Sequence, residues 1–434
     1  MNKIAFTTLG LLASLLSAQG QAVIPGEYIV QLHPGSNPQA VAALHGIATR
    51  HVFTTAVNGF SGNIPPGILR QLANDPSVAG ISPDRQVFAI GKPSAGGGAG
   101  STVQTIPAGI TRIGAAPKEG GITGAGVGVA IVDTGIDFNH KDLRVSDAQF
   151  SAFGGTAQDD QGHGTHVAGT VAAVNNSLDV VGVAPAATLY PVKVLNSRGS
   201  GSDAGIIAGL DWIARNSAHL NPPIRVANLS LGRTGTAGDN STLRAAFSKL
   251  TGLGITVVVA AGNDSSQEVS QNVPAAYPEV IAVASTTALQ GTSQYSSYPL
   301  GIAADTASYF TTDGAWDENG NTGVTISAPG EDQENISKAG FISSVGILST
   351  KLGGGTTRMS GTSMASPHVA GVVALLYQKA GGTLNSEEAR SALMLGAVKL
   401  YKAPYNSPTN SYTFDGDREG ILSASGSLQQ LNAP

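Results

Sequence analysis

Cysteine is absent from all 434 residues. This absence excludes disulfide bonds, cysteine-ligated zinc, iron–sulfur clusters and a thiol nucleophile. Charged residues are also scarce, at 12%, about half the average for soluble domains. The net charge of −5 argues against a nucleic-acid-binding protein that works through bulk positive charge. Beyond the N-terminus no stretch approaches about 18 uninterrupted apolar residues, so the sequence predicts no membrane anchor.

What is present is glycine, with 57 residues, and a hydrophobic fraction of 41% that predicts a folded core. Residues 1–22 carry one lysine near the start, then an apolar run, then small residues. This order is typical of a secretory signal, with cleavage after Gly20 or after Ala22. We therefore expect a secreted protein whose stability comes from packing or bound metal.

Residues 23–90 predict a compact first unit with the order β-α-β-α-β, which suits a small ferredoxin-like α+β fold. The expected strands are 27–32, 57–64 and 78–90, and the expected helices are 38–45 and 65–73. Residues 91–102 read GKPSAGGGAGST. Because this composition favours a flexible chain, we expect an exposed linker that contains a processing site.

The third region, 103–434, alternates short apolar runs with helical patterns. Strands are expected at 127–132, 188–195, 225–231, 256–261 and 280–285, and helices at 166–174, 203–214 and 366–379. Such alternation indicates an α/β fold, with a parallel sheet covered by helices on both faces. Residues 298–345 interrupt the rhythm and are expected to be a surface insertion. Their acidic residues could hold a further cation, but a solvated face is the simpler interpretation.

Three segments carry groups that acyl transfer requires. Asp133 follows an apolar strand, at the end where α/β proteins place their sites. His163 stands at a helix entrance, and Ser363 stands at a helix N-terminus, whose dipole favours developing negative charge. A hydroxyl becomes a good nucleophile once an imidazole takes its proton, and a carboxylate orients the imidazole. Each residue alone is more commonly structural, whereas the three together predict a catalytic triad.

A fourth segment is a buried apolar strand that ends in Gly262-Asn263. The side-chain amide of Asn263 can donate to an oxyanion, and the backbone N–H of Ser363 can be the second donor. Taken alone, Asn263 would be read as a turn residue.

These segments resemble the subtilase family of serine proteases, and in particular the secreted bacterial subtilisins. VDTGID around Asp133, HGTHVAGT from His163 and GTSMASPHVAG from Gly361 match the three signature blocks of the family. The resemblance implies a three-layer catalytic domain over 103–434, with Asp133, His163 and Ser363 as the triad and Asn263 as the oxyanion donor. It also implies that 23–90 is an inhibitory propeptide, cut from the enzyme between residues 88 and 103. The expected partners are protein substrates and the propeptide itself, and the enzyme is expected to be a monomer.

The same resemblance implies a substrate cleft between two strands that pair with an extended peptide. One strand would supply Ser230, Leu231 and Gly232, and the opposing strand Gly199, Ser200 and Gly201. Asp264 matches a position on the rim of the primary pocket. Asn272 falls near its base, where many relatives have glycine. We therefore expect cleavage after medium-sized apolar residues, with some tolerance of basic ones.

A polar loop at 174–180 supplies oxygens of the kind that Ca²⁺ prefers, although the loop alone does not specify a metal. The resemblance implies a strong calcium site made by residues on this loop and on two other segments, namely Gln104, Asp142, Val174, Asn176, Leu178 and Val180. Without an ion, the loop would be an asparagine-rich turn.

Two other functions compete with the protease hypothesis. One is a non-catalytic binding module on a protease scaffold, which the presence of all four catalytic residue types argues against. The other is an esterase of the α/β-hydrolase type, which needs the motif G-x-S-x-G and the order Ser–Asp–His. Here residue 365 is alanine and the order is Asp–His–Ser.

Overall fold

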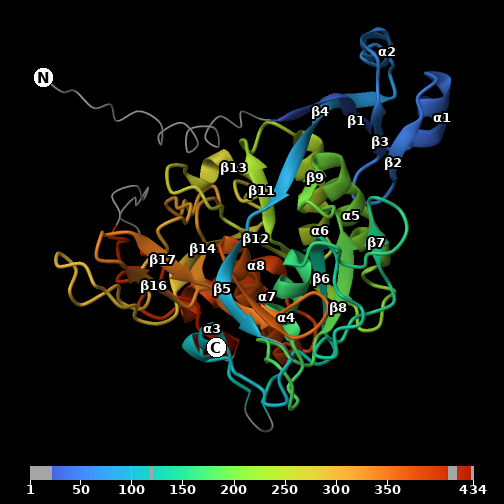
Figure 1. Ribbon diagram of the computed structural model, residues 1–434. Helices are drawn as coiled ribbons and strands as arrows, with labels where there is room; N and C mark the ends of the chain where they lie inside the picture. Colours follow the sequence, from blue (N-terminus) through green and yellow to red (C-terminus); the bar gives the residue numbers. More distant parts are fainter. Residues whose placement is uncertain (1–21, 99, 118–120, 409–417, 432–434) are drawn as a thin grey trace, which may run out of the picture.

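The computed structural model describes residues 22–98, 100–117, 121–408 and 418–431 (Figure 1). The export signal expected at 1–22 therefore lies outside the described residues, except for Ala22. Within the described ranges, no helix has the length and apolar character needed to cross a membrane.

The centre of the molecule is a seven-stranded parallel sheet with the order β15-β14-β12-β10-β6-β8-β7. The predicted strands are confirmed within a few residues. Because β8 lies on one side of β6 and β10 on the other, the chain reverses direction along the sheet at β6. Ligand sites of open α/β sheets lie at the carboxyl ends of the strands beside such a point. The strands are β6 (Gly128–Asp133), β7 (Phe150–Ser151), β8 (Thr188–Lys193), β10 (Ile224–Leu229), β12 (Thr256–Ala260), β14 (Ile281–Thr287) and β15 (Ile326–Glu331).

Helices cover both faces of this sheet, as the sequence predicts. One face packs against α4 (His163–Ala172) and α7 (Thr362–Lys379), whose apolar residues form one core with the strands. The other face packs against α5 (Asp203–Asn216) and α6 (Ser241–Gly252), which share a second core. Three further helices complete the larger unit, namely α3 (Ala108–Arg112), α8 (Ser386–Gly396) and α9 (Ala424–Gln430).

The first unit projects from the body of the molecule (Figure 1). Its order is β-α-β-β-α-β, one strand more than predicted, and its strands pair in the order β4-β1-β3-β2. It has a small core of its own. The elements are β1 (Val23–Leu32), α1 (Pro38–Leu44), β2 (Thr49–Phe53), β3 (Gly59–Asn63), α2 (Pro66–Leu72) and β4 (Val78–Ala89).

Strand β4 joins the two units into one sheet, because it leaves the first unit and enters the body (Figure 1). There it lies between β9 (Ser200–Ser202) and β11 (Leu231–Thr234), antiparallel to both. The far edge of this sheet is β13 (Asn272–Val273), which follows the single-turn helix η1 (Val269–Gln271).

Two predictions about irregular segments were wrong. The expected flexible linker forms β5 (Lys92–Gly98), which pairs with β19 (Thr356–Ser360), and β19 pairs in turn with β18 (Ile347–Thr350). The expected surface insertion at 298–345 contains β15, a strand of the central sheet, as well as the fully buried Ser308 and Thr311. Only the hairpin of β16 (Gln333–Ile336) and β17 (Ile342–Val345) adds a small separate sheet. The sequences of β5 and β15 have no apolar pattern that predicts a strand. Such strands can still form, since backbone pairing does not require apolar side chains.

Candidate active site

Asp133 and His163 meet at the carboxyl edge of the central sheet. Asp133 is the last residue of β6 and His163 is the first residue of α4. The Nδ1 atom of His163 lies 2.8 Å from Oδ1 and 3.0 Å from Oδ2 of Asp133, and the side chains are 2% and 0% exposed. Gly164 allows this approach, because a Cβ there would lie 2.1 Å from the carbonyl oxygen of Gly135.

The surroundings of His163 favour its protonated form. Burial alone would lower the pKa of the imidazole, but the charge and hydrogen bond of Asp133 and the charge of Asp159 outweigh burial, so the pKa is raised above 6.5. The carboxylate of Asp133 also orients the imidazole. Because Nδ1 points toward this carboxylate, Nε2 faces the cleft. Nε2 is buried and has no hydrogen-bond partner within the described residues.

Ser363 stands at the N-terminus of α7, as predicted, and is fully buried. Its hydroxyl donates to the carbonyl oxygen of Ser230 at 3.0 Å, and the hydroxyl of Ser230 donates to the carbonyl of Ser363 at 2.9 Å. Ser363 is thus hydrogen-bonded to the residue that immediately precedes β11. Gly91 lies against the ring, since a Cβ on Gly91 would be 2.7 Å from Nε2 of His163.

Asn263 follows β12 and points its amide into the cleft. Its Oδ1 accepts from the backbone N–H and the hydroxyl of Thr362, both at 2.9 Å. These two bonds fix which way the amide faces. Its Nδ2 donates to the carbonyl oxygen of Ile90. A side-chain amide aimed at a peptide carbonyl beside a serine hydroxyl is the arrangement that stabilises an oxyanion.

The predicted cleft residues hold a segment of the chain itself. Strand β4 pairs through Phe88 with Gly232 on one side and with Ser200 on the other, while Leu231 faces Ala89 and Gly201 faces Val87. The N–H of Ala89 donates to the carbonyl of Gly199 at 2.9 Å, and the N–H of Ile90 to that of Ser230 at 3.4 Å. The family resemblance implies a propeptide whose C-terminal strand blocks the cleft, and residues 87–89 of β4 pair with both predicted cleft edges.

A cavity of about 480 Å³ adjoins Ile90. Asp264 and Asn272 line it, where the sequence predicted the rim and the base of the primary pocket. Asn272 is buried and its Nδ2 donates to the carbonyl of Ala261 at 2.6 Å. Its Oδ1 would lie 3.0 Å from a Cβ on Gly232, so Asn272 narrows the cavity beside that strand.

The predicted calcium ligands also gather at one place. Four oxygens surround Nε2 of Gln104: the carbonyls of Val174 at 2.8 Å, Val180 at 3.0 Å and Leu178 at 3.3 Å, and Oδ1 of Asn176 at 3.4 Å. An amide nitrogen carries two hydrogens, so it cannot serve four acceptors. A ring of oxygens with too few donors fits a cation of the Ca²⁺ class.

Asp142 borders this ring through two hydrogen bonds. Asn176 Nδ2 donates to its Oδ1 at 2.9 Å, and the N–H of Val180 to its Oδ2 at 3.1 Å. Burial raises the pKa of Asp142 to about 7. Within the described residues, no group of three or more His, Asp or Glu side chains could hold a metal, so carbonyl and amide oxygens would have to supply most of the ligands.

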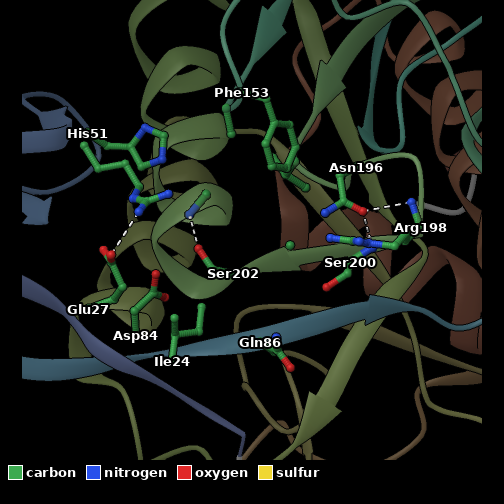
Figure 2. A pocket seen from close by; sticks show the side chains of 15 residues that line it. Ile24, Glu27, His51, Asp84, Gln86, Phe153, Asn196, Arg198, Ser200 and Ser202 are labelled. Carbon is green, nitrogen blue, oxygen red and sulfur yellow. Dashed lines mark hydrogen bonds and ion pairs between the residues drawn. The ribbon is translucent and has the colours of Figure 1, made fainter. Parts of the chain in front are cut away.

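The first unit contacts the body through apolar and polar groups, and Ile29, Phe53 and Val87 are buried in the same core as α5 and α6. Figure 2 shows a cavity of about 220 Å³ between them, with Glu27, His51 and Asp84 on one side and Arg198 on the other. Burial, aided by the charge of Arg50, lowers the pKa of His51 to about 4.

Two buried carboxylates, those of Asp211 and Asp84, join the first unit to the body by hydrogen bonds. Oδ1 of Asp211, on α5, accepts from the N–H groups of residues 54, 55 and 56 at 3.0, 2.6 and 2.8 Å. Asp84, on β4, accepts from the N–H of Ala204 at 3.0 Å and so caps the start of α5. Sequence reasoning missed both residues, because each serves a partner far away along the chain.

Comparison with known proteins places this geometry in a family. The model of the subtilase family of peptidases matches residues 124–417. This chain belongs to the subtilase family. It is 38% identical over 321 residues to the alkaline elastase YaB of Bacillus sp. (strain YaB), which covers 74% of this chain and 69% of that relative. It is also 35% identical over 357 residues to an alkaline protease of Shouchella clausii, covering 81% and 78% of the two chains.

Subtilisin Savinase of Lederbergia lenta is a third relative of this subtilase, 38% identical over 304 residues, with 69% of this chain and 95% of that one covered. The family and these relatives make the protein a serine endopeptidase that acts on protein substrates. The three-layer α/β fold expected from the resemblance is confirmed.

Proposed function

We propose that the protein is a secreted serine endopeptidase, made as an inactive precursor that cuts itself. One observation carries the proposal: the chain runs through its own cleft, with the carbonyl of Ile90 held by Asn263 and the next residue, Gly91, against His163. The Ile90–Gly91 peptide bond is therefore the bond that the site is poised to break.

In this proposal Ser363 is the nucleophile. Its Oγ attacks the carbonyl carbon of the scissile bond as Nε2 of His163 takes the hydroxyl proton. The hydroxyl has to leave the carbonyl of Ser230, to which it donates in this structure, before it can donate to that nitrogen. Asp133 keeps Nδ1 of the ring protonated and stabilises the imidazolium. The negative charge on the carbonyl oxygen is met by Nδ2 of Asn263 and by the N–H of Ser363.

The tetrahedral intermediate collapses when the C–N bond breaks. His163 gives its proton to the leaving amine, and the acyl group stays on Ser363. A water molecule then attacks the acyl carbon with His163 as base, and the acid product leaves. Because the imidazole must be neutral to act as a base, activity should rise with pH as His163 loses its proton.

Residues 23–90 act in this proposal as an inhibitory propeptide. Support comes from the pairing of β4 with both cleft edges and from the hydrogen bonds of Asp211 and Asp84 across the interface. After the cut, the segment ending at Ile90 is a product that still fills the cleft. Ile90 itself supports the expected preference for medium-sized apolar residues, because it is the residue before the proposed scissile bond.

We also propose that Ca²⁺ binds at the oxygen ring around Gln104, with Val174, Asn176, Leu178, Val180 and Asp142. The bound ion would supply positive charge that no side chain present provides there. It would hold the 174–180 loop and the segment of Gln104 together without taking part in the chemical steps. Secretion and a monomeric state complete the proposal, and both rest on the sequence.

An intact-mass time course of the purified chain, beside its Ser363→Ala variant, tests the proposal. The wild type should release a fragment that ends at Ile90, and the variant should remain whole. Removal of the nucleophile costs about 10⁶-fold in turnover in subtilisin, and we adopt that value. If both proteins stay whole although folded, the non-catalytic binding module is the better reading. If both are cut alike, a contaminating protease acts on the chain.

A further inference from the structure

We propose that the edge of β19 is an extended binding site for the substrate chain on the carboxyl side of the scissile bond. The site takes an unfolded protein segment as an added β-strand, reaching to about the eighth residue after the bond. This inference rests on the proposed function and specifies its substrate class.

The first ground is continuity. The chain that places Ile90 at Asn263 and Gly91 at His163 continues directly as β5. Strand β5 lies antiparallel to β19, with Lys92 facing Ser360, Ser94 facing Arg358 and Gly98 facing Thr356. Residues two to four after the bond therefore pair with β19 in continuous register, and the eighth pairs with the same strand after a register shift.

The second ground is the position of β19 in its sheet. On one side it pairs with β18, which packs against α4, so that side is closed. On the other side its partner is β5, and the sheet ends there. When β5 leaves, a row of backbone N–H and C=O groups is exposed, and such an edge is a template for another strand. Its carboxyl end leads straight into Gly361 and the nucleophile Ser363.

The third ground is that β19 has few charged side chains with which to select a substrate by its charge. Its cationic side chain, Arg358, is held by Oδ2 of Asp332 at 2.5 Å and by the carbonyl of Gly346, also at 2.5 Å. The occupant KPSAGGG has small residues after its first two positions. Recognition through the backbone alone accepts any sequence that is extended, and it excludes folded segments.

The experiment uses the fully processed enzyme and peptides that begin VFAI and continue for two, four or eight residues as GK, GKPS or GKPSAGGG. Competition in one tube, with products quantified by mass spectrometry, gives relative kcat/KM. We expect at least about a tenfold rise from two to eight residues, because each added backbone hydrogen bond is gained only by the longer chains. A matched series that lengthens the other end beyond VFAI controls for length itself.

A second measurement moves a single N-methyl group along the positions of Ser94 to Gly98 in the longest peptide. A paired strand loses rate only where an N–H points at β19, so neighbouring positions should differ. A flat length series, or equal effects of every N-methyl group, would overturn the inference while leaving the protease intact. Failure to cut any peptide or casein would instead overturn the proposed function, and this inference with it.

Discussion

The side-chain amide of Asn263 donates to the carbonyl oxygen of Ile90. This bond joins two residues that are far apart in the sequence, and in the proposed function Asn263 is the oxyanion donor and Ile90 supplies the carbonyl that it serves. Oδ1 of Asn263 accepts two hydrogen bonds from Thr362. These bonds fix the orientation of the amide, so Nδ2 already faces the cleft before a foreign substrate binds.

Replacing Asn263 with leucine should therefore lower kcat on a peptide substrate with little change in KM. We adopt the range established for this donor in subtilisin, about 10²- to 10³-fold. Steady-state kinetics of the two enzymes would measure it. The variant is refolded with the propeptide supplied in trans. A rise in KM with kcat unchanged would contradict the assigned role.

Gly91 should control the first cut. A Cβ at Gly91 would stand 2.7 Å from Nε2 of His163, whereas one at Gly98 meets nothing closer than Oγ1 of Thr356 at 4.0 Å. Gly91→Val should slow release of residues 23–90 by at least about tenfold, while Gly98→Ala should not. Both rates come from the intact-mass time course. Equal rates for the two variants would place the first cut elsewhere.

Asp211 should contribute to binding of residues 23–90 by the mature enzyme. Asp211→Ala removes the acceptor of three backbone N–H groups, and a charged acceptor contributes about 1.5–3 kcal/mol. Inhibition by the isolated segment should weaken about 10- to 100-fold. Asp211→Asn keeps one oxygen and should lie between the two. Asp147→Ala, at an exposed position, is the control and should match the wild type.

Glu331 and Glu334 should limit stability at alkaline pH. Both are fully buried, and burial raises the pKa of each carboxyl group, helped by the charge of Asp332 at Glu331 and by that of Glu331 at Glu334. The neighbouring charges, Asp332 and Arg358, form a pair with each other. A raised pKa means that the stabilising protonated state is present at low pH and is lost as pH rises through the folded pKa.

Glu334→Gln keeps an acceptor for the N–H of Tyr309, which donates to Oε1 at 2.8 Å, and removes the ionisation. Measured in the Ser363→Ala background to prevent self-digestion, Tm should be nearly unchanged at pH 5 and higher by about 2 °C or more at pH 10. Glu318→Gln, at an exposed site, should change Tm at neither pH. A benefit of Glu334→Gln that is equal at both pH values would contradict this account.

Calcium should stabilise the uncut Ser363→Ala chain, because the oxygen ring is complete in it. Adding Ca²⁺ after chelation should raise Tm, and Gln104→Ala should reduce the increase. Val103→Ala, next in the chain and 72% exposed, is the matched control. A Tm that does not respond to Ca²⁺ in the parent chain would remove the metal from the proposal.

The sequence predicts most of the central sheet and the residues of the candidate active site. The central strands alternate with helices at regular spacing, and the residues of the three signature blocks stand where the apolar runs end. Strand β5 could not be predicted, since its partner β19 lies more than 250 residues away in the chain and KPSAGGG has no strand preference of its own. Strand β2 was missed because its sequence, TRHVF, has too few apolar residues to show a period. The family resemblance implied that the propeptide blocks the cleft, whereas the individual contacts of residues 87–90 depend on tertiary placement.

Gln104 already lies in its ring of oxygens while the chain is uncut, fourteen residues beyond Ile90. With the first cut at Ile90–Gly91, the new N-terminal tail is rooted at that ring and stays within reach of the cleft. Its effective concentration there is on the order of millimolar, as for any short flexible tether. The first cut is a unimolecular event, because the scissile bond already lies in the cleft of its own chain, and its rate should not change with the protein concentration. Until the tail is removed, it competes with foreign substrate for the same cleft.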